Sequence, residues 1–363
     1  RSLFSSGRIG VQANVGPLVR PTTRAQYLAK SVAIPTNLFS HSDQQNESQT
    51  SAPNSLSVVG WGGKIADAMQ YANSGAQYPM VVSTAGSAPF ANGTQTQPVN
   101  IVAQPPGTPQ TGVNCSVGGS NNSAASQAEC DNRKSSLQQL LTFDTGAALV
   151  QEASGVMSKS FLYTDLLNQA RSGIPNLNWP IDTGLGDQLR TVAEIIQVQA
   201  TLNLQRQIFF VSLGGFDTHA AQGAAAGFHP NLLAQLDGAL ATFNTVMTEL
   251  GMQNKVTTFT LSDFGRTLQP NTGLGTDHAW GNHQLVMGGA VQGQKLFGTF
   301  QNLAMGNVTN SDDAGNNGRW IPTTSVDQFG ATLARWFGVS DANLPAIFPN
   351  LANFTTQDMG FFG

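Results

Sequence analysis

Short apolar segments that alternate with helical patterns are the feature of this sequence that most constrains its fold. Segments typical of strands lie at residues 9–14, 78–86, 208–213, 256–261 and 284–291. Apolar residues recur at helical spacing elsewhere, for example from Leu232 to Leu250, where Gly251 follows as a helix-ending residue. Strands that alternate with helices form mostly parallel sheets covered on both faces. We therefore predict an α/β fold with a doubly wound, mostly parallel sheet flanked by helices.

The length of 363 residues suits a single large domain, and the 40% of apolar residues are enough for a sizeable core. Residues 87–134 are rich in Gly, Pro, Thr, Asn and Gln and are too many for a plain connection, so we interpret them as a polar surface insertion within the domain 1–363. This segment contains the only two cysteines, Cys115 and Cys130. We predict that they form a disulfide, as in proteins of oxidising compartments; the alternative is a pair of free, exposed thiols.

Composition argues against two classes of partner. The net charge is −4 and no basic run or stripe occurs, which argues against nucleic-acid binding. No apolar run reaches the ~18 residues of a membrane span. Only 10% of residues are charged, against about a quarter in typical domains, and amide and hydroxyl side chains take their place. Such a surface is typical of an exported protein.

Ionisable side chains follow the strand-forming segments directly. Asp217 and His219 come after residues 208–213, and Asp263 and Arg266 come after residues 256–261. Ligands in open α/β sheets bind at the carboxyl ends of strands, so we expect these side chains to lie close together. With the later motif GTDHAWGNH, the predicted metal ligands are Asp217, His219, Asp263, Asp277, His278 and His283.

The spacing of Asp217 and His219 favours a shared ion. Residues two apart in an extended segment point to the same side. Carboxylate oxygen and neutral imidazole together suit Zn²⁺ or Mn²⁺, so we predict a divalent metal of this kind. The alternative is that these side chains only cap and cross-link loops. His229 has no acidic neighbour in sequence, and we assign that structural role to it.

The upstream motif LFSHSDQQ offers hydroxyl groups beside a histidine, His41. Ser40 or Ser42 can act as a nucleophile if a metal lowers the pKa of its hydroxyl. A serine at the N-cap of a helix explains either residue equally well.

The motifs GGFDTH, SDFGRT and GTDHAWGNH, in this order and spacing, resemble those of a bacterial exported family known as domain of unknown function 1501. The blocks NVGPLVRPTTRAQY, LFSHSDQQ and GWGGKIAD resemble upstream parts of one branch of that family, so the resemblance covers nearly the whole chain. The family is placed in the alkaline-phosphatase and sulfatase superfamily. The resemblance therefore implies an alkaline-phosphatase-like fold, a metal-assisted site for ester hydrolysis, and export.

The resemblance also implies roles for individual residues. The Asp-His pair and the later histidine of one metal site correspond to Asp217, His219 and either His278 or His283. Asp263 lies where superfamily enzymes place the Asp-His pair of a second metal, but the next residue here is Phe264. The motif that holds Ser40 and Ser42 lies near the superfamily's nucleophile.

Members of the superfamily begin with a strand that ends in a metal-binding aspartate, and this chain starts after that region. We therefore expect the first strand to be missing, with residues 9–14 near the gap. A cleaved N-terminal fragment, or a homo-oligomer, would then accompany the chain.

Two functions remain open at this point. The first is an exported, metal-dependent hydrolase of phosphate or sulfate esters, in which Arg266 steadies the anionic group of the substrate or forms a structural salt bridge. The second is a non-catalytic extracellular protein that keeps the fold and uses its surface for assembly or glycan binding.

Overall fold

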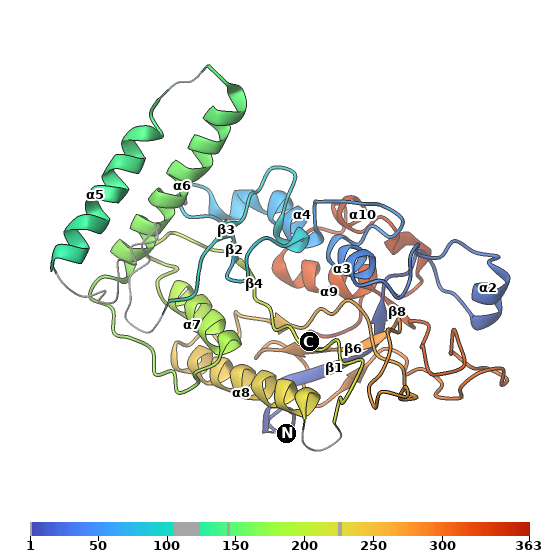
Figure 1. Ribbon diagram of the computed structural model, residues 1–363. Coiled ribbons are helices and arrows are strands. Elements are labelled where there is room, and N and C mark those ends of the chain that lie inside the picture. The colour runs from blue at the N-terminus through green and yellow to red at the C-terminus, as the bar shows by residue number, and fades with distance from the viewer. Residues whose placement is uncertain (1, 105–123, 144–145, 224–226) are drawn as a thin grey trace.

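The protein is described by a computed structural model that covers residues 2–104, 124–143, 146–223 and 227–363 (Figure 1). Within these residues the strands form two sheets. The five-stranded sheet has the order β5-β6-β1-β7, and β8 also pairs with β1. Its strands are β1 (Ile9–Gly16), β5 (Thr258–Phe259), β6 (Asn282–Met287), β7 (Leu296–Phe297) and β8 (Thr324–Ser325). The three-stranded sheet has the order β3-β2-β4, with β2 (Val81–Ser83), β3 (Val99–Asn100) and β4 (Ile208–Phe210).

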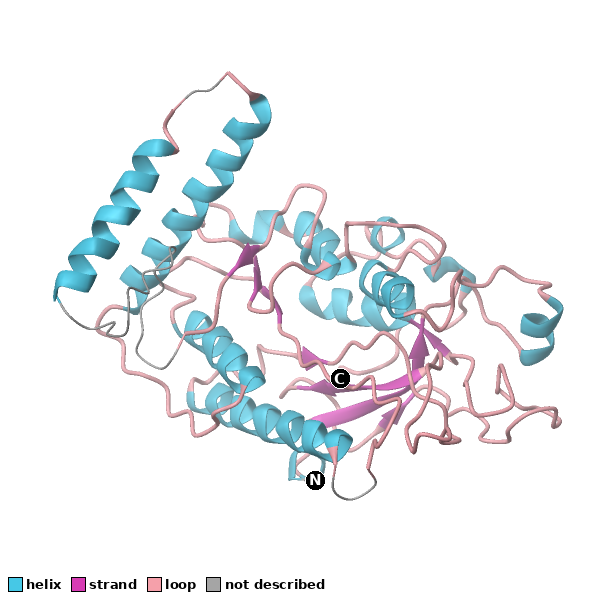
Figure 2. Cartoon of the chain, in the orientation of Figure 1, coloured by secondary structure: helices cyan, strands magenta, loops and turns pink. Residues whose placement is uncertain are grey.

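Helices cover both faces of these strands, and long loops connect the elements (Figure 2). On one side α7 (Gly184–Gln197) packs along α8 (Phe228–Glu249). The other side carries α3 (His41–Thr50), α4 (Trp61–Ala68), α9 (Val326–Phe337) and α10 (Leu344–Ile347). Two helices, α5 (Ala124–Leu140) and α6 (Ala148–Arg171), form a hairpin that projects from the body (Figure 1). The short helix α1 (Ser2–Ser5) precedes β1, and α2 (Arg24–Ala29) lies at the opposite end of the molecule from the hairpin. The predicted α/β class is thus confirmed.

Strand β4 shows how the two helical layers share the sheet. Ile208 and Phe210 pack into the apolar cluster with α4 and α9, whereas Phe209 packs into the cluster with α7 and α8. This alternation is the period of two of an extended strand with both faces covered. Helix α8 was predicted on its apolar spacing, and Gly251 follows it in a left-handed conformation with φ 66°.

The larger sheet is mixed, whereas the sequence suggested one mostly parallel sheet. Strands β7 and β8 run parallel to β1, but β6 runs antiparallel to both β1 and β5. The reason lies in the connection between β5 and β6, which contains a loop and no helix. Parallel neighbours need a long crossover, usually helical, whereas antiparallel neighbours can be joined by a loop.

The expected gap beside residues 9–14 is absent from the described structure. Strand β1 pairs with β6 on one edge and with β7 and β8 on the other. Strands β3, β7 and β8 each pair with one strand in the described residues, as do β4, which pairs only with β2, and β5, which pairs only with β6. Strands β4 and β5 pack on the same aromatic ring, because Phe210 and Phe259 lie 5.8 and 6.2 Å from Phe90. The segment 208–213, which was expected to be fully buried, is only half-buried along β4.

The segment predicted as a surface insertion is divided by the structure. Phe90 is buried, and β3 joins the smaller sheet, so its first part belongs to the body of the protein. Its last part forms the beginning of α5, where Cys130 is buried. Cys115 lies outside the described residues, and the Cys115–Cys130 disulfide stays a prediction. None of the described helices combines the length and apolarity needed to cross a membrane.

Asp327, in the first turn of α9, is a buried carboxyl group with 1% of its surface exposed. Its Oδ1 accepts a hydrogen bond of 2.9 Å from the backbone N–H of Asn350. Burial raises the pKa of Asp327 to about 6, and this effect outweighs its hydrogen bonds and the positive charge of Lys64. The ionised form is therefore disfavoured in the folded state.

We predict that Asp327→Asn removes a pH-dependent loss of stability. Between the ordinary pKa of 3.8 and the folded value of about 6, the unfolded chain ionises first, so wild-type stability falls as pH rises. Above that window the free energy of unfolding stays lower by a constant amount of about 3 kcal/mol. This amount follows from the rise of the pKa from 3.8 to about 6, because one pKa unit corresponds to about 1.4 kcal/mol. The free energy of unfolding, measured with urea from pH 4 to pH 8, should become larger for the variant than for the wild type as the pH rises to 6. Asp358→Asn, at an exposed position, should have the same free energy of unfolding as the wild type across this range. If the wild type and Asp327→Asn show the same pH dependence of this free energy, the prediction is contradicted.

Candidate metal centre

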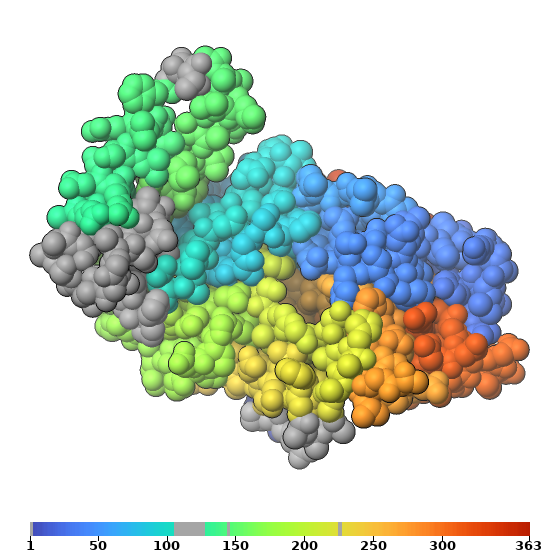
Figure 3. Space-filling view, viewed as in Figure 1, coloured from blue at the N-terminus to red at the C-terminus, as the bar shows by residue number. Residues whose placement is uncertain are grey.

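Three parts of the chain converge on one side of the molecule. His41 is the first residue of α3. Asp217 and His219 lie in the loop that follows β4, and a third group of residues lies in the loop between β5 and β6. In the space-filling view, the blue, yellow and orange parts of the chain meet around a hollow (Figure 3). The residues from the third loop are Asp263, Arg266, Asp277 and His278.

The two loops are held together by backbone contacts. Thr276 donates its backbone N–H to the carbonyl of Thr218 at 3.0 Å, and Ala221 donates its backbone N–H to the carbonyl of Gly273 at 3.0 Å. Gly275 lies directly against the preceding loop, because an added Cβ would come within 2.2 Å of the carbonyl carbon of His219. Only glycine permits so close an approach of two backbones. The loops therefore place their side chains in a fixed relation.

One carboxylate oxygen, Oδ1 of Asp217, lies at the centre of the cluster. Four nitrogen atoms surround it: Arg266 Nη1 at 2.7 Å, His219 Nε2 at 2.9 Å, His278 Nε2 at 3.1 Å and His41 Nε2 at 3.2 Å. The candidate ligand atoms of His41, Asp217 and His278 all lie within 4.8 Å of one another. The three loops thus bring three imidazoles to a single oxygen atom.

The other ring nitrogen of each histidine faces an oxygen acceptor. The Nδ1 atoms of His41, His219 and His278 lie 3.0 Å from Asp263 Oδ2, 3.3 Å from Asp277 Oδ1 and 2.6 Å from the carbonyl oxygen of Phe39, respectively. An ionised carboxylate and a carbonyl only accept hydrogen bonds, so Nδ1 carries the proton in each ring. In the neutral tautomer, Nε2 then presents its lone pair to Asp217.

Arg266 supplies the positive charge beside this oxygen, and neutral imidazoles add none. His219 Nε2 lies 2.8 Å from His278 Nε2, so two lone pairs face each other as well as the carboxylate. His41 Nε2 is buried and faces the same oxygen at 3.2 Å. Extra protons or a metal cation would relieve this repulsion. Burial lowers the pKa of His41, but hydrogen bonds to Asp263 and Asp217 raise it more, so it lies above its ordinary value.

Asp217 itself is held in its ionised form. Burial raises the pKa of Asp217, but the hydrogen bond from Arg266, with those from His41 and His278 when their Nε2 atoms carry protons, outweighs this effect and holds the pKa well below its usual range. The guanidinium of Arg266 also donates through Nε to Thr276 Oγ1 at 3.1 Å and through Nη2 to the carbonyl of Thr276. Arg266 therefore anchors Asp217 between the two loops, the structural salt bridge that the sequence left open.

Phe264 fixes the plane of two imidazoles. Its ring lies 4.6 Å from that of His41 and 4.7 Å from that of His278. The family resemblance implies a histidine of a second metal site at this position, and a phenyl ring packs there instead. Asp263, the expected partner of that histidine, binds His41 Nδ1. The described residues accordingly gather around one centre.

The two candidate nucleophiles lie apart from this centre. Ser40 Oγ donates to Asp43 Oδ2 at 2.5 Å and lies 3.2 Å from Ser42 Oγ. No contact joins either hydroxyl to the histidines of the cluster in the described structure. The motif contributes His41 instead, a residue that was absent from the predicted ligands. The motif offered both hydroxyl groups and an imidazole, and the imidazole is the group that lies in the cluster.

His283, a predicted ligand, also lies outside the cluster. It belongs to β6, where its Nδ1 accepts a hydrogen bond of 3.3 Å from the backbone N–H of Asn14. Its ring stacks on Phe300 at 5.1 Å, and burial lowers its pKa. The prediction failed because β6 begins at Asn282, so the chain leaves the site before His283 is reached. His278 is the histidine of this motif that the structure brings to the cluster.

Comparison with known proteins identifies a family. Among curated proteins none matches the chain. A family model described as "Protein of unknown function (DUF1501)" matches residues 6–344, a range that includes every residue of the cluster. The protein therefore belongs to the DUF1501 family.

Proposed function

We propose that this protein is an exported, metal-dependent hydrolase of phosphate or sulfate esters with an alkaline-phosphatase-like fold. One observation carries the proposal: three imidazoles, each fixed through Nδ1 by an oxygen acceptor, direct Nε2 at the same oxygen of Asp217. Metal-bound histidines in proteins almost always donate their second N–H to a carboxylate or carbonyl in this way.

The residues present fit a divalent metal. His41, His278 and Asp217 would hold it, and His219 lies within 2.9 Å of the shared carboxylate oxygen. Imidazole nitrogens with one carboxylate oxygen suit Zn²⁺ or Mn²⁺ better than Ca²⁺ or Mg²⁺, which prefer oxygen. The buried Nε2 of His41 faces Asp217 Oδ1 at 3.2 Å, so a metal bound there would contact both atoms.

The exposure of the cluster supports a catalytic centre over a structural one. The side chains of His41, Asp217 and His219 are 41%, 44% and 47% exposed. Structural zinc sites are closed by protein ligands, whereas catalytic sites leave a position open to water and substrate. Metal at this position would activate a bound water molecule and polarise an ester oxygen.

The charges of the surrounding residues favour an anionic substrate. Three aspartates, at positions 217, 263 and 277, contribute −3, and two arginines, Arg266 and Arg319, contribute +2. The sum of −1 becomes +1 when a divalent cation is added. Arg319 donates through Nε to the carbonyl of His278 at 2.9 Å, and its guanidinium lies over the ring of Phe39 at 4.4 Å. The hydroxyl of Ser40 is engaged by Asp43, so water is the proposed nucleophile.

A second candidate function is a non-catalytic role in extracellular assembly or glycan binding. The observation that favours it is the hairpin of α5 and α6, which projects from the body (Figure 1). Apolar side chains on α6 are exposed there, including Leu149 at 83% and Val156 at 61%. Exposed apolar surface of this kind often marks a contact with another protein.

We further propose that a β-strand from outside this chain, either a cleaved N-terminal fragment or a second copy, occupies the space between β4 and β5. The N–H of Ile208 donates to the carbonyl of Met80, directly before β2, so by alternation the N–H of Phe209 faces the opposite edge. Likewise Thr260 donates to Leu285, so the N–H of Phe259 faces away from β6. Unpaired strand edges of this kind are templates for another strand.

We predict that hydrogen exchange distinguishes the two edges of each strand. In the isolated chain, the amides of Phe209 and Phe259 should exchange much faster than those of Ile208 and Thr260, which have backbone acceptors. NMR-detected exchange on the 363-residue chain measures all four. Equal protection on both edges in a monomer would rule out a vacant strand position.

We predict that His278→Ala abolishes tight metal binding. The variant loses one of three clustered ligands, so metal content measured by mass spectrometry should fall below a tenth of the wild-type value. A metal bound only to the folded state at a hundredfold excess over Kd stabilises it by about 2.7 kcal/mol. A chelator should therefore lower the Tm of the wild type but leave that of the variant unchanged.

The matched control for the metal experiment is His229→Ala. His229 lies at the start of α8, where its ring packs on Phe216 at 5.7 Å, and within the described residues its side chain does not hydrogen-bond to the cluster. This variant should retain both the metal and the chelator-sensitive Tm. A wild-type protein that purifies without metal, and whose Tm does not respond to zinc or manganese, would overturn the metal assignment.

We predict that the metal-loaded wild type hydrolyses an aryl phosphate or an aryl sulfate, and that His278→Ala lowers kcat/KM at least a hundredfold. The expected loss reflects removal of the metal's charge stabilisation, worth several kcal/mol. His229→Ala should keep wild-type turnover. If the wild type binds one metal per chain but turns over neither class of ester, the hydrolase proposal fails and the non-catalytic function takes its place.

A further inference from the structure

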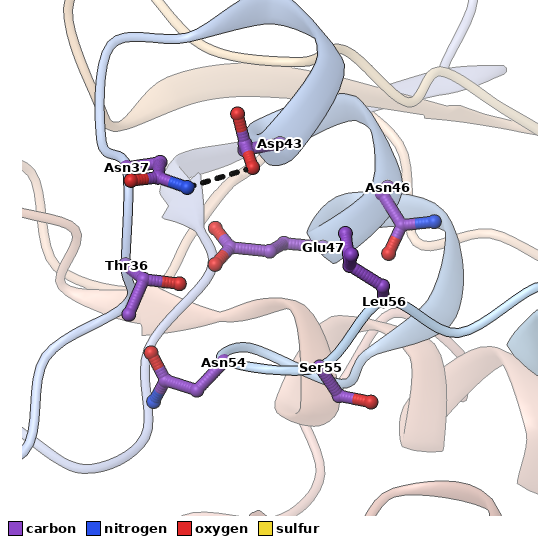
Figure 4. Close-up of a pocket in the computed structure, with 8 residues that line it drawn as sticks. All are labelled: Thr36, Asn37, Asp43, Asn46, Glu47, Asn54, Ser55 and Leu56. Carbon is purple, nitrogen blue, oxygen red and sulfur yellow. Dashed lines mark hydrogen bonds between the residues drawn. The ribbon is translucent and has the colours of Figure 1, made fainter.

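We infer that a second site, a pocket on the outer side of α3, binds a hard divalent cation such as Ca²⁺. The pocket has a volume of about 140 Å³ and lies between α3 and the segments before and after it (Figure 4). Oxygen-bearing side chains line it, among them Thr36, Asp43, Glu47, Asn54 and Ser55. This inference goes beyond the proposed hydrolase function and does not rest on it.

Glu47 is the residue that points to a ligand. Only 3% of its surface is exposed, and its Oε2 has no hydrogen-bond partner in the described part of the chain. Figure 4 shows its carboxylate extended into the pocket, toward Thr36. A buried carboxylate oxygen without a partner is unfavourable unless a proton or cation compensates its charge. Burial and the nearby charge of Asp43 raise the pKa of Glu47 to about 7, against a hydrogen bond that the backbone of Asn54 donates to the carboxylate.

The rest of the lining adds acceptors and lacks positive charge. Asp43 lies one helical turn before Glu47, on the same face of α3. One of its oxygens accepts from Asn37 Nδ2 at 3.0 Å. Asn46 donates its Nδ2 to the carbonyl of Ser57 at 2.6 Å, which leaves its Oδ1 buried without a partner. No lysine or arginine lines the pocket.

Chemistry and size together select the ligand class. Ca²⁺ takes six to eight oxygen ligands from carboxylates, amide oxygens and water, whereas Zn²⁺ prefers nitrogen and sulfur, which this lining lacks. The volume of about 140 Å³ is well below the ~300 Å³ at which pockets for organic ligands begin. A cation with some of its water shell fits this space. Glu47 and Asp43 would supply the charge, and Figure 4 shows the hydroxyl of Thr36 and the side-chain oxygen of Asn54 facing Glu47.

The position of the pocket gives the cation a structural role. Helix α3 consists of the residues HSDQQNESQT and has no apolar residue, yet half of it is buried. The backbone on both sides is left-handed, with φ 53° at Asn37 and 72° at Asn54. A cation bound to Asp43, Glu47 and Thr36 would tie α3 to the segment before it. The same helix begins at His41, so the tie would also hold one histidine of the metal centre in place.

Calorimetric titration of chelator-treated full-length protein with CaCl₂ tests the site. The wild type should bind one Ca²⁺ per chain, and its Tm should rise when Ca²⁺ is added. Glu47→Gln, which keeps the shape but removes the charge, should weaken Ca²⁺ binding at least tenfold. Glu152→Gln, at an exposed position on α6, should bind as the wild type does.

Two further variants separate this site from the histidine cluster and from a folding defect. His219→Ala should leave Ca²⁺ affinity unchanged, because His219 lies in the loop after β4. Thr36→Val, at an exposed position, removes one hydroxyl ligand and should weaken Ca²⁺ binding severalfold with little effect on the Tm measured without Ca²⁺. The inference is overturned if the wild type shows no binding at 1 mM CaCl₂, or if Glu47→Gln and Thr36→Val both bind Ca²⁺ as tightly as the wild type.

Discussion

The convergence of three imidazoles and one guanidinium on Oδ1 of Asp217 is the interaction on which the rest of the site depends. A single carboxylate oxygen cannot accept four hydrogen bonds well, and three of the surrounding nitrogens carry lone pairs in the neutral tautomer. Only the guanidinium of Arg266 is a certain donor, and it keeps Asp217 ionised. The remaining negative potential is what a divalent cation would compensate.

This geometry requires elements that are distant in sequence to be held rigidly. Backbone contacts join the loop after β4 to the loop between β5 and β6, and Gly275 allows their close approach. Phe264 packs against His41 and His278, which fixes their ring planes without adding a ligand. Sites of this kind depend on such supporting contacts, because a displacement of about 1 Å removes a ligand from its position.

The sequence predicted part of this arrangement for sound physical reasons. Asp217, His219 and Asp263 follow strands, and strand ends gather at one edge of a sheet. The sequence could not show which residues are candidate ligands and which only orient the histidines. Asp263 and Asp277 contact histidine Nδ1 atoms, and this depends on side-chain directions in three dimensions. His283 was wrongly included because the start of β6 cannot be located from composition. The antiparallel pairing of β5 with β6 was missed because a loop and a helical crossover were not distinguished between them.

Helix α3 connects the two proposed cation sites, and its composition explains why it suits both. A helix in a soluble protein is normally held by an apolar stripe, and α3 has none. Directional contacts replace it: Gln44 accepts from the N–H of Phe39 at 2.5 Å, Gln49 accepts from the N–H of Phe90 at 3.1 Å, and the carbonyl of Ser48 accepts from Trp61 Nε1 at 3.0 Å. Such contacts fix position sharply but contribute only about 1 kcal/mol each. Helix α3 has little other stabilisation, so an ion bound near His41 or Glu47 would change the stability of the whole helix. Ion binding at one end of α3 would thereby affect the position of the ligand at the other end.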